Sequence, residues 1–521
     1  MKYLLFLVFV TIGLYASAQK VSVKIVNTNN VTSHTLNWTM REKSDFKIGD
    51  NIIQVENTGS SMQLAYTAKL SREKHALILH KMNADGKEIA TGKLENGERV
   101  FGPVPTVPVF FSNKLLLFYF RYEDKDTMKL YLSEVDVESL TIKKTQQLYK
   151  FVQRNSGLFG MSSVMSTEIM TSVSPDDKKL LVAYKSGTDE MYSAVFSSDL
   201  AVLRTKVSRP VFPDKAEISE VFLENSGNCV FGLSSAYGSE FEHLLTKGFF
   251  VQRMDNSERM IPFNTIGAGF TPEHLHIQPS ADFSKLYACG DYSGDRFMEG
   301  VWVVEIQSQQ FRLNKPSVFT YPDDFKKRMY KTGFGTRKKD NYTVMPVDYQ
   351  LIEFANGDFA LGGYAKSKTE MTHASGKTYI TLLAGPVVTI FMDKGFKQAN
   401  FAMIPRNHVI RSGSEGIFVP YKDKLVVLYN DYAKNFDEDL SDASVDRIRV
   451  NMVKEVALGY AVINKEAKIE QRKLLSEGIS RMNYFNTMNF QKLSDTHFLI
   501  PSAADDKKTD MNKVADVTIT D

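Results

Sequence analysis

The chain has 521 residues, with 64 basic and 61 acidic side chains and a formal net charge of +3. This balance lacks the strong basic excess of most nucleic-acid binders, so no nucleic-acid partner is predicted. Two cysteines are too few for a disulfide framework. Because single hydrophobic cores stop growing at about 250–300 residues, the chain must divide into domains or repeat a small unit.

The chain begins with a predicted signal peptide at residues 1–18. Lys2 precedes an apolar run over residues 3–14, and Ala16 and Ala18 frame a small-x-small cleavage pattern. The run is shorter than the about 20 residues that span a bilayer. The Ser-Ala-Gln junction resembles that of exported proteins of the Bacteroidota. We expect export by the general secretory route to the periplasm or the exterior, without a transmembrane segment; the alternative is a buried first helix or strand.

One phrase recurs along the chain, a polar turn followed by an apolar strand. It is clearest at residues 174–196, SPDDKKLLVAYKSGTDEMYSAVF. Less regular strands precede the copies and alternating strands follow them, and residues 75–94 form a predicted hairpin. Four short antiparallel strands per unit are typical of a propeller blade. The eight candidate copies lie at 59–67, 111–120, 178–186, 226–235, 282–294, 355–367, 421–431 and 493–502.

The phrase at 174–196 resembles the WD40-like β-propeller repeat of the TolB family, whose pattern begins Ser-Pro-Asp-Gly-Lys. Asp177 stands where that family usually has glycine, and no copy carries the Gly-His and Trp-Asp dipeptides of true WD40 repeats. The resemblance implies the fold and no functional residue. We predict an all-β chain forming one β-propeller over residues 19–521, with eight four-stranded blades. Seven blades, two four-bladed propellers and stacked β-sandwiches are the alternatives.

Strands at both ends of the chain are expected to close the ring. The N-terminal segment 20–27, KVSVKIVN, alternates apolar and polar residues. Near the C-terminus NFQKL, HFLIP and VADVTIT offer three more strands. Since an open sheet edge exposes unpaired backbone groups, we predict that the terminal strands complete one shared blade.

The two cysteines lie in comparable strands of successive repeats. If the following glycines are aligned, the thiols of Cys229 and Cys289 point the same way and do not meet. If the preceding turns are aligned, the parity reverses, because side chains alternate along a strand. The sequence favours two buried free thiols and leaves a disulfide open.

Most catalytic motifs are absent from the sequence. It contains no G-x-S-x-G, H-E-x-x-H, paired C-x-x-C or Walker A pattern, and no dinucleotide-binding loop, so no cofactor is predicted. His274 and His276 are the metal candidates, because residues two apart on a strand share a face. A further ligand would be needed, and Glu273 would point the other way. The alternative is two polar residues in a partly exposed strand.

Two polar insertions stand out, at 321–346 and at 430–446. The first mixes basic and aromatic residues, which suits an acidic glycan, a peptide carboxylate or a protein partner. The favoured alternative is a solvated loop between blades with buried aromatic anchors. Its candidate ligand-binding residues are Tyr330, Phe334, Arg337, Lys338 and Lys339. The second insertion is acidic but lacks the alternating order of a calcium loop, so a solvated acidic loop is expected there.

The leading functional hypothesis is a monomeric, non-enzymatic binding or scaffold module for a protein, peptide or glycan ligand. Rigid scaffolds commonly present binding loops from one face. The rival hypothesis is a glycoside hydrolase or lyase with carboxylates in the central funnel. That chemistry needs two acids about 5 to 10 Å apart, a spacing that sequence cannot show when the residues come from different blades.

Overall fold

The computed structural model describes the chain from Lys20 to Thr520 with gaps. The predicted signal peptide and the first candidate copy, 59–67, lie outside the described residues. These residues are 20–29, 43–48, 51–57, 76–82, 88–95, 107–122, 127–152, 169–186, 190–213, 216–236, 244–263, 270–294, 298–338, 341–342, 344–372, 378–410, 416–437, 440, 444, 449–450, 456–476, 484–485, 487, 490–503 and 511–520.

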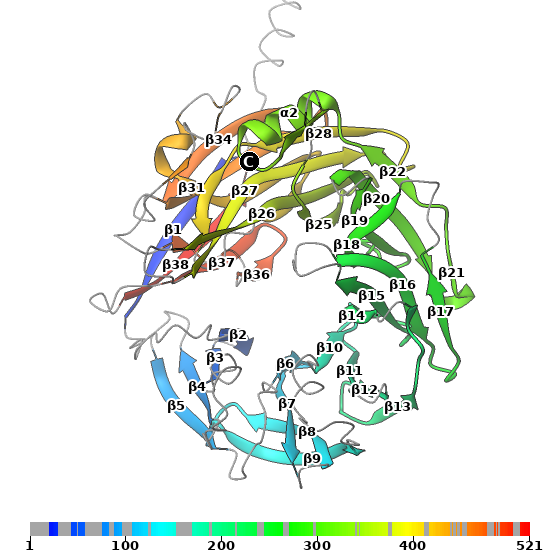
Figure 1. Ribbon diagram of the computed structural model, residues 1–521. Coiled ribbons are helices and arrows are strands. Elements are labelled where there is room, and N and C mark those ends of the chain that lie inside the picture. The colour runs from blue at the N-terminus through cyan, green and yellow to red at the C-terminus, as the bar shows by residue number, and fades with distance from the viewer. Residues whose placement is uncertain are drawn as a thin grey trace, which may run out of the picture.

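Antiparallel sheets follow one another around a central opening, which confirms the all-β propeller fold (Figure 1). Three four-stranded sheets come first, each pairing its strands in chain order. We call them sheets B, C and D. Sheet B contains β2 (Lys43–Ile48), β3 (Asn51–Asn57), β4 (Ala76–Met82) and β5 (Glu88–Glu95). Sheet C contains β6 (Val107–Phe111), β7 (Lys114–Tyr122), β8 (Thr127–Asp136) and β9 (Thr141–Val152). Sheet D contains β10 (Met170–Val173), β11 (Lys179–Lys185), β12 (Met191–Ser197) and β13 (Val202–Ser208).

A nine-stranded sheet, sheet E, comes next and consists of two groups. Among the described residues, the ladder between the groups consists of Leu245 of the first opposite Glu273 of the second. The first group contains β14 (Glu217–Leu223), β15 (Cys229–Ala236), β16 (Leu244–Gln252) and β17 (Glu258–Pro262). The second contains β18 (Thr271–Pro279), β19 (Leu286–Ser293), β20 (Met298–Gln307), β21 (Arg312–Leu313) and β22 (Ser317–Thr320).

Two further sheets, G and H, precede the C-terminal strands. Sheet G contains β25 (Val347–Glu353), β26 (Phe359–Thr372), β27 (Thr378–Met392), β28 (Ala399–Ile404), β29 (Asn407–Ile410) and β32 (Arg449–Val450). Both β28 and β29 pair with β27, at different ends of that long strand. Sheet H contains β30 (Ile417–Tyr421), β31 (Lys424–Tyr432), β33 (Val456–Asn464) and β34 (Ile469–Ser476).

The last sheet, sheet A, combines the two ends of the chain. It contains β1 (Lys20–Asn29), β35 (Tyr484–Phe485), β36 (Gln491–Ser494), β37 (His497–Ala503) and β38 (Met511–Thr520). β1 pairs antiparallel with β38 from Lys20 opposite Thr520 to Asn29 opposite Met511. The pairing is the one expected for a shared terminal blade. The number of blades and the closure of the whole ring stay predictions.

The recurring phrase marks the second strand of a sheet unit. Seven of the eight candidate copies coincide with β7, β11, β15, β19, β26, β31 and β37. The turn before several of these strands holds a left-handed residue two positions ahead of the strand: Ser112, Asp177, Gly227, Gly357 and Lys422. Asp177 therefore adopts the conformation that glycine adopts readily, at φ 52°.

The hydrophobic cores lie between neighbouring sheets. Sheets C and D share one cluster that includes Phe118 and Tyr184, and sheets G and H share another that includes Val387 and Val427. The second strands are almost wholly buried because both of their faces are covered, as in β11 and β19. The first strands are half-exposed, as in β14, and β10, β14 and β18 lie nearest the opening in Figure 1.

Among the described residues the regular helices are few and short. They are α2 (Asp323–Lys331), η3 (Ser308–Gln310) and η4 (Ala433–Phe436). The insertion 321–346 was expected to be a loop, and that expectation is wrong for α2 and for the hairpin of β23 (Arg337–Lys338) and β24 (Asn341–Tyr342). The charges of α2 complement its helix dipole. Its first turn carries Asp323 and Asp324, and its last turn carries Arg328 and Lys331.

Candidate functional site

The candidate surface is built on α2, whose inner face anchors it to the ring. Phe325 and Met329, one turn apart, are buried in the core between sheets E and G. The Tyr321 ring, just before the helix, stacks on Phe325 at 5.2 Å. The ammonium group of Lys326 pairs with Glu299, and this lysine is buried as well. The helix is therefore fixed to the sheets.

The predicted ligand residue Phe334 is one of these anchors. Its side chain is fully buried, and a Cβ on Gly385 would lie 2.5 Å from its ring. Glycine at this position lets the aromatic ring lie directly against the β27 backbone. Phe334 therefore faces the core, as the alternative with buried aromatic anchors expected, and positions the surface.

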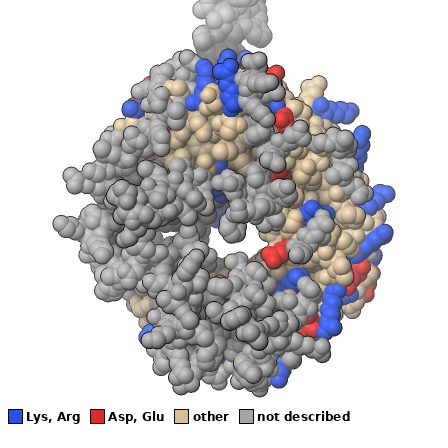
Figure 2. Space-filling view, viewed as in Figure 1, with Lys and Arg blue, Asp and Glu red and all other residues tan. Residues whose placement is uncertain are grey.

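The outer face of α2 carries basic and aromatic side chains. Lys327 and Tyr330 are exposed, and Lys331 is half-exposed on the same side of the helix. The Tyr330 ring lies 5.3 Å from the Tyr342 ring of β24, and the Arg337 guanidinium lies 5.5 Å from the centre of that ring. Figure 2 shows Lys and Arg side chains gathered over α2. We call Lys327, Tyr330, Lys331, Arg337 and Tyr342 the α2 surface.

The side chains of two predicted ligand-binding residues, Lys338 and Lys339, are not part of the described structure. Lys338 belongs to β23, but its side chain is not described, and Lys339 lies outside the described residues. The sequence analysis did not single out Tyr342, which joins the surface because β24 returns beside β23. The surface is polarised along the helix: Asp323 and Asp324 are exposed at its N-terminal end, and the basic groups lie toward its C-terminal end.

A buried polar network fixes the chain just before α2. The Tyr321 hydroxyl donates to Asp291 Oδ1 at 2.9 Å and lies 2.9 Å from the Tyr349 hydroxyl. The backbone N–H of Val347 donates to Asp291 Oδ2 at 2.8 Å. Burial raises the pKa of Asp291, while the bonds that it accepts oppose that rise. The carboxyl thus ties β19 to β25 and to the base of the helix.

The two predicted metal ligands, His274 and His276, both lie on β18, beside the opening. A bulge between Glu273 and His276 breaks the alternation of the strand, and His274 has φ 48°. The expectation that both imidazoles share a face rests on that alternation and stays a prediction. His274 Nδ1 lies 3.5 Å from Asp291, and His276 Nδ1 lies 2.7 Å from Glu220 Oε1.

Each histidine thus approaches a different carboxylate. Within the described part of the chain, no group of three or more His, Cys, Asp or Glu residues could hold a metal ion. Metal binding at His274 and His276 stays a prediction that needs a ligand from elsewhere.

His276 belongs to a polar group that spans three first strands. Its other ring nitrogen lies 3.2 Å from Gln278 Oε1, and Lys366 pairs with Asp348 at 3.0 Å. Burial alone would lower the pKa of His276, but the hydrogen bond and charge of Glu220, with the charge of Asp348, raise it. His276 therefore contacts the carboxylate of β14 and also feels the charge of the carboxylate on β25.

Cys289 lies opposite His276 in the β18–β19 ladder, so a thiol, an imidazole and the Glu220 carboxylate lie close together. The three groups resemble a catalytic triad of a nucleophile, a base and an orienting acid. The electrostatics of the thiol, however, oppose a role as nucleophile. Burial raises the pKa of Cys289 well above its ordinary value, and the charges of Glu220, Asp291 and Asp348 raise it further. A catalytic cysteine needs the opposite shift, so this thiol is inert.

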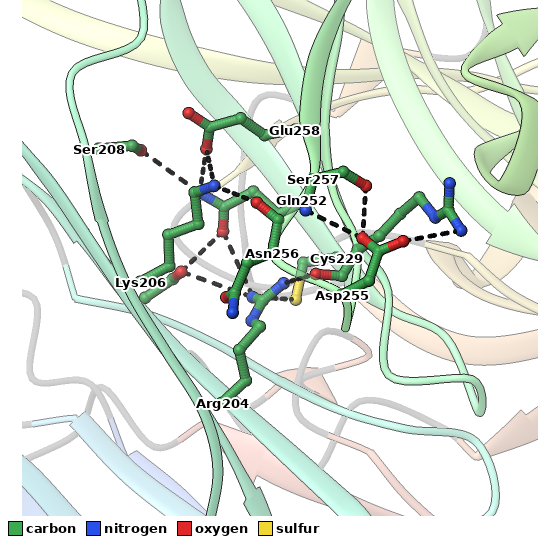
Figure 3. A network of polar contacts seen from close by, with 11 residues as sticks. Arg204, Lys206, Ser208, Cys229, Gln252, Asp255, Asn256, Ser257 and Glu258 are labelled. Atoms are coloured by element: carbon green, nitrogen blue, oxygen red, sulfur yellow. Dashed lines mark hydrogen bonds and ion pairs between the residues drawn. The ribbon is translucent and has the colours of Figure 1, made fainter.

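The other cysteine belongs to a brace between neighbouring sheets (Figure 3). Both cysteines are buried and free, as the sequence favoured. Arg204 of β13 donates to Cys229 Sγ at 3.1 Å and to Gln252 Oε1 at 3.3 Å. Burial raises the pKa of Cys229 to about 11 although Arg204 opposes the shift. The brace joins sheet D to sheet E and offers no accessible nucleophile.

The second insertion also differs from its prediction at its start. Asp431 was expected in a solvated acidic loop, but its side chain is buried at the end of β31. Asp437 is exposed. The remaining acidic residues of the segment, Glu438, Asp439, Asp442 and Asp446, lie outside the described residues.

No model of a known family and no curated protein matches this sequence. Solved structures with a similar course of the chain include the β-propeller domain of the Trilobed protease from Pyrococcus furiosus, with 10% identity, a TM-score of 0.31 and coverage of 84% of this chain and 99% of that one. Polysaccharide lyase Uly1 has 9% identity, a TM-score of 0.36 and coverage of 81% and 91%. The α-L-arabinofuranosidase Arb93A from Fusarium graminearum has 9% identity, a TM-score of 0.30 and coverage of 70% and 97%. Likenesses this weak carry no argument about function.

Proposed function

We propose that the chain is an exported, eight-bladed propeller, closed by its terminal strands and related to the TolB-type repeats, that acts as a monomeric, non-enzymatic binding module. Its ligand is an acidic glycan, and its binding site is the α2 surface. Export rests on the N-terminal sequence pattern. In the described part of the chain no helix is long and apolar enough to cross a bilayer.

The observation that carries the proposal is that one face of α2 is buried against the sheets while the other is exposed to solvent. The inner face fixes the helix through Phe325, Met329 and Phe334. The outer face presents Lys327 and Tyr330 to solvent. A rigid mount lowers the entropy cost of binding, because few side chains need to be ordered when the ligand arrives.

The chemistry of the outer face favours an acidic sugar chain. A flat aromatic ring such as that of Tyr330, 39% exposed, can cover the apolar face of a sugar. Lys327 and Arg337 nearby supply charge for carboxylate or sulfate groups. An acidic peptide shares the charge but does not need the ring, so peptide binding is the competing outcome of the test.

The rival hypothesis, a hydrolase or lyase, would use Glu220 and Asp348, whose charges both act on His276 beside the opening. Glu220 accepts bonds from His276 and from the backbone N–H of Ile277, and Asp348 pairs with Lys366. A carboxylate that already accepts two hydrogen bonds, as Glu220 does, has less capacity left to accept a proton from a substrate. This engagement supports binding over catalysis.

A binding assay with an acidic polysaccharide, a neutral polysaccharide and polyglutamate tests the proposal. Lys327→Glu should weaken acidic-glycan binding about fivefold, because one charge contact is worth about 1 kcal/mol. Tyr330→Ala should weaken glycan binding but not polyglutamate binding. The control is Lys178→Glu, which changes an exposed lysine on the turn before β11. This variant should bind the acidic polysaccharide as the natural protein does. The proposal would be refuted if Lys327→Glu bound the acidic polysaccharide as tightly as the natural protein. It would also be refuted if the natural protein cleaved the polysaccharide and Glu220→Gln abolished that cleavage.

A further inference from the structure

The interface between sheets G and H ends in a polar cluster. Most of the interface is apolar and includes Ala402 and Ile404 of β28 and Val427 of β31. At one end the same faces carry two pairs of polar residues, each pair two positions apart. Arg406 directly precedes β29 and His408 lies within it, and Tyr429 and Asp431 come from β31. We call these four residues the G–H polar cluster.

All four side chains are deeply buried. Arg406 and Tyr429 are fully buried, Asp431 is 1% exposed and His408 is 3% exposed. An arginine and an aspartate are almost never buried to this degree unless they are paired or hydrogen-bonded. The surroundings must therefore supply partners for them.

Part of that requirement is met by the protein. Arg406 Nε donates to the carbonyl oxygen of Gly385 at 2.8 Å, and Nη1 donates to that of Asn430 at 3.1 Å. Asp431 Oδ1 accepts from its neighbour's backbone N–H at 2.8 Å and from the Asn435 amide at 3.0 Å.

One polar atom of each cluster residue is left over. No described residue provides a partner for Arg406 Nη2, His408 Nδ1, the Tyr429 hydroxyl or Asp431 Oδ2. The four residues are close enough for their charges to interact. Asp431 and Tyr429 act on the pKa of Arg406, and Arg406 acts on that of His408. Among the described ion pairs, however, Arg406 and Asp431 do not contact each other directly.

We propose that the G–H polar cluster is a binding site for internal water, which bridges Arg406 to Asp431 and joins sheet G to sheet H. A buried water makes about three hydrogen bonds to polar groups that otherwise lack partners. Four such atoms therefore call for one or two molecules. The bridge converts two separated buried charges into a connected ion pair.

Other occupants fit the cluster less well. A small anion would be repelled by Asp431, and a metal cation by Arg406, since both residues lie in the same cluster. An apolar guest would leave all four atoms without hydrogen-bond partners, each at the cost of its lost hydration. Only a small neutral molecule that both donates and accepts hydrogen bonds satisfies a guanidinium, a carboxylate, a hydroxyl and an imidazole together.

The direction in which Tyr429→Phe changes the melting temperature tests the proposal. If water bonds the Tyr429 hydroxyl, Tyr429→Phe removes a satisfied bond and should lower the melting temperature by about 1–2 °C. If the hydroxyl is buried without a partner, the same change removes a desolvated group and should raise it. Tyr321→Phe, which breaks the described bond to Asp291, is the control and should lower the melting temperature.

A high-resolution crystal structure of the full chain supplies the second measurement. It should show one or two ordered waters about 3 Å from Arg406 Nη2 and Asp431 Oδ2. A direct contact between the guanidinium and the carboxylate, or a Tyr429→Phe variant more stable than the natural protein, would overturn the proposal.

Discussion

Removing β1 should expose the edge of the terminal sheet and destabilise the protein. The perturbation compares a chain that begins at Gln19, the predicted mature start, with one that begins at Asn30, just after β1. The second chain lacks all ten residues that pair with β38, from Lys20 to Asn29. Both chains lack the predicted signal peptide, so they differ only in Gln19 and the strand β1.

The expected magnitude comes from the burial of β38. Ala515 and Val517 are fully buried and Ile519 is 2% exposed. Uncovering roughly 40 Å² on each costs about 1 kcal/mol apiece, at about 25 cal/mol per Å². Losing the hydrogen bonds of the β1–β38 ladder destabilises the shorter chain, but that chain also avoids the entropy cost of ordering β1. These two effects are of similar size and oppose each other. Burial therefore sets the net loss in the free energy of unfolding, about 3 kcal/mol.

Thermal and urea unfolding followed by circular dichroism measure this loss. The chain that begins at Asn30 should melt several degrees lower and aggregate more, because an unpaired strand edge can pair with another chain. A peptide with the sequence of β1, KVSVKIVNTN, should restore part of the lost stability. The same melting temperature for both chains, with no effect of the peptide, would refute closure by β1.

Three further predictions follow from single groups. Gly290→Ala should cost several kcal/mol, because a Cβ there would lie 2.3 Å from the Glu273 carbonyl oxygen; a wild-type melting temperature would contradict this. Asp431 has a pKa raised from 3.8 to about 6 by burial, so the folded state holds its proton more tightly. The stability of the natural protein relative to Asp431→Asn should therefore increase by up to about 3 kcal/mol from pH 7 to pH 4, and a flat difference would contradict the sign. His276 has a raised pKa, so its stabilisation is present below its ordinary pKa and is lost as the pH rises through the raised value; Glu220→Gln should lower that pKa in an NMR titration, and no change would contradict the pairing.

The repeat unit could be predicted from the sequence because the phrase encodes local physics. A polar turn and a fully apolar run predict a strand covered on both faces, and β11 and β31 have that burial. The pairing of the two terminal segments was also predictable, since alternating segments at both ends need partners, and β1 pairs with β38.

The helix α2 was missed because it is short and its apolar stripe is only Phe325 and Met329. The acidic residues in its first turn and the basic ones in its last were a usable signal. The left-handed His274 and the bulge beside it could not be predicted, because bulges depend on the neighbouring strand. For the same reason, the burial of Asp431 near Arg406, which comes from another sheet, has no signal in local sequence.

The central claim is that an acidic glycan binds the α2 surface and not the central opening. Hydrogen–deuterium exchange of the full chain, with and without an acidic polysaccharide, tests it most directly. Binding should slow exchange in residues 323–338 and in the β24 segment around Tyr342, and leave β14 and β18 unchanged. Protection confined to the strands that carry Glu220 and His276 would contradict the claim and place the ligand in the opening.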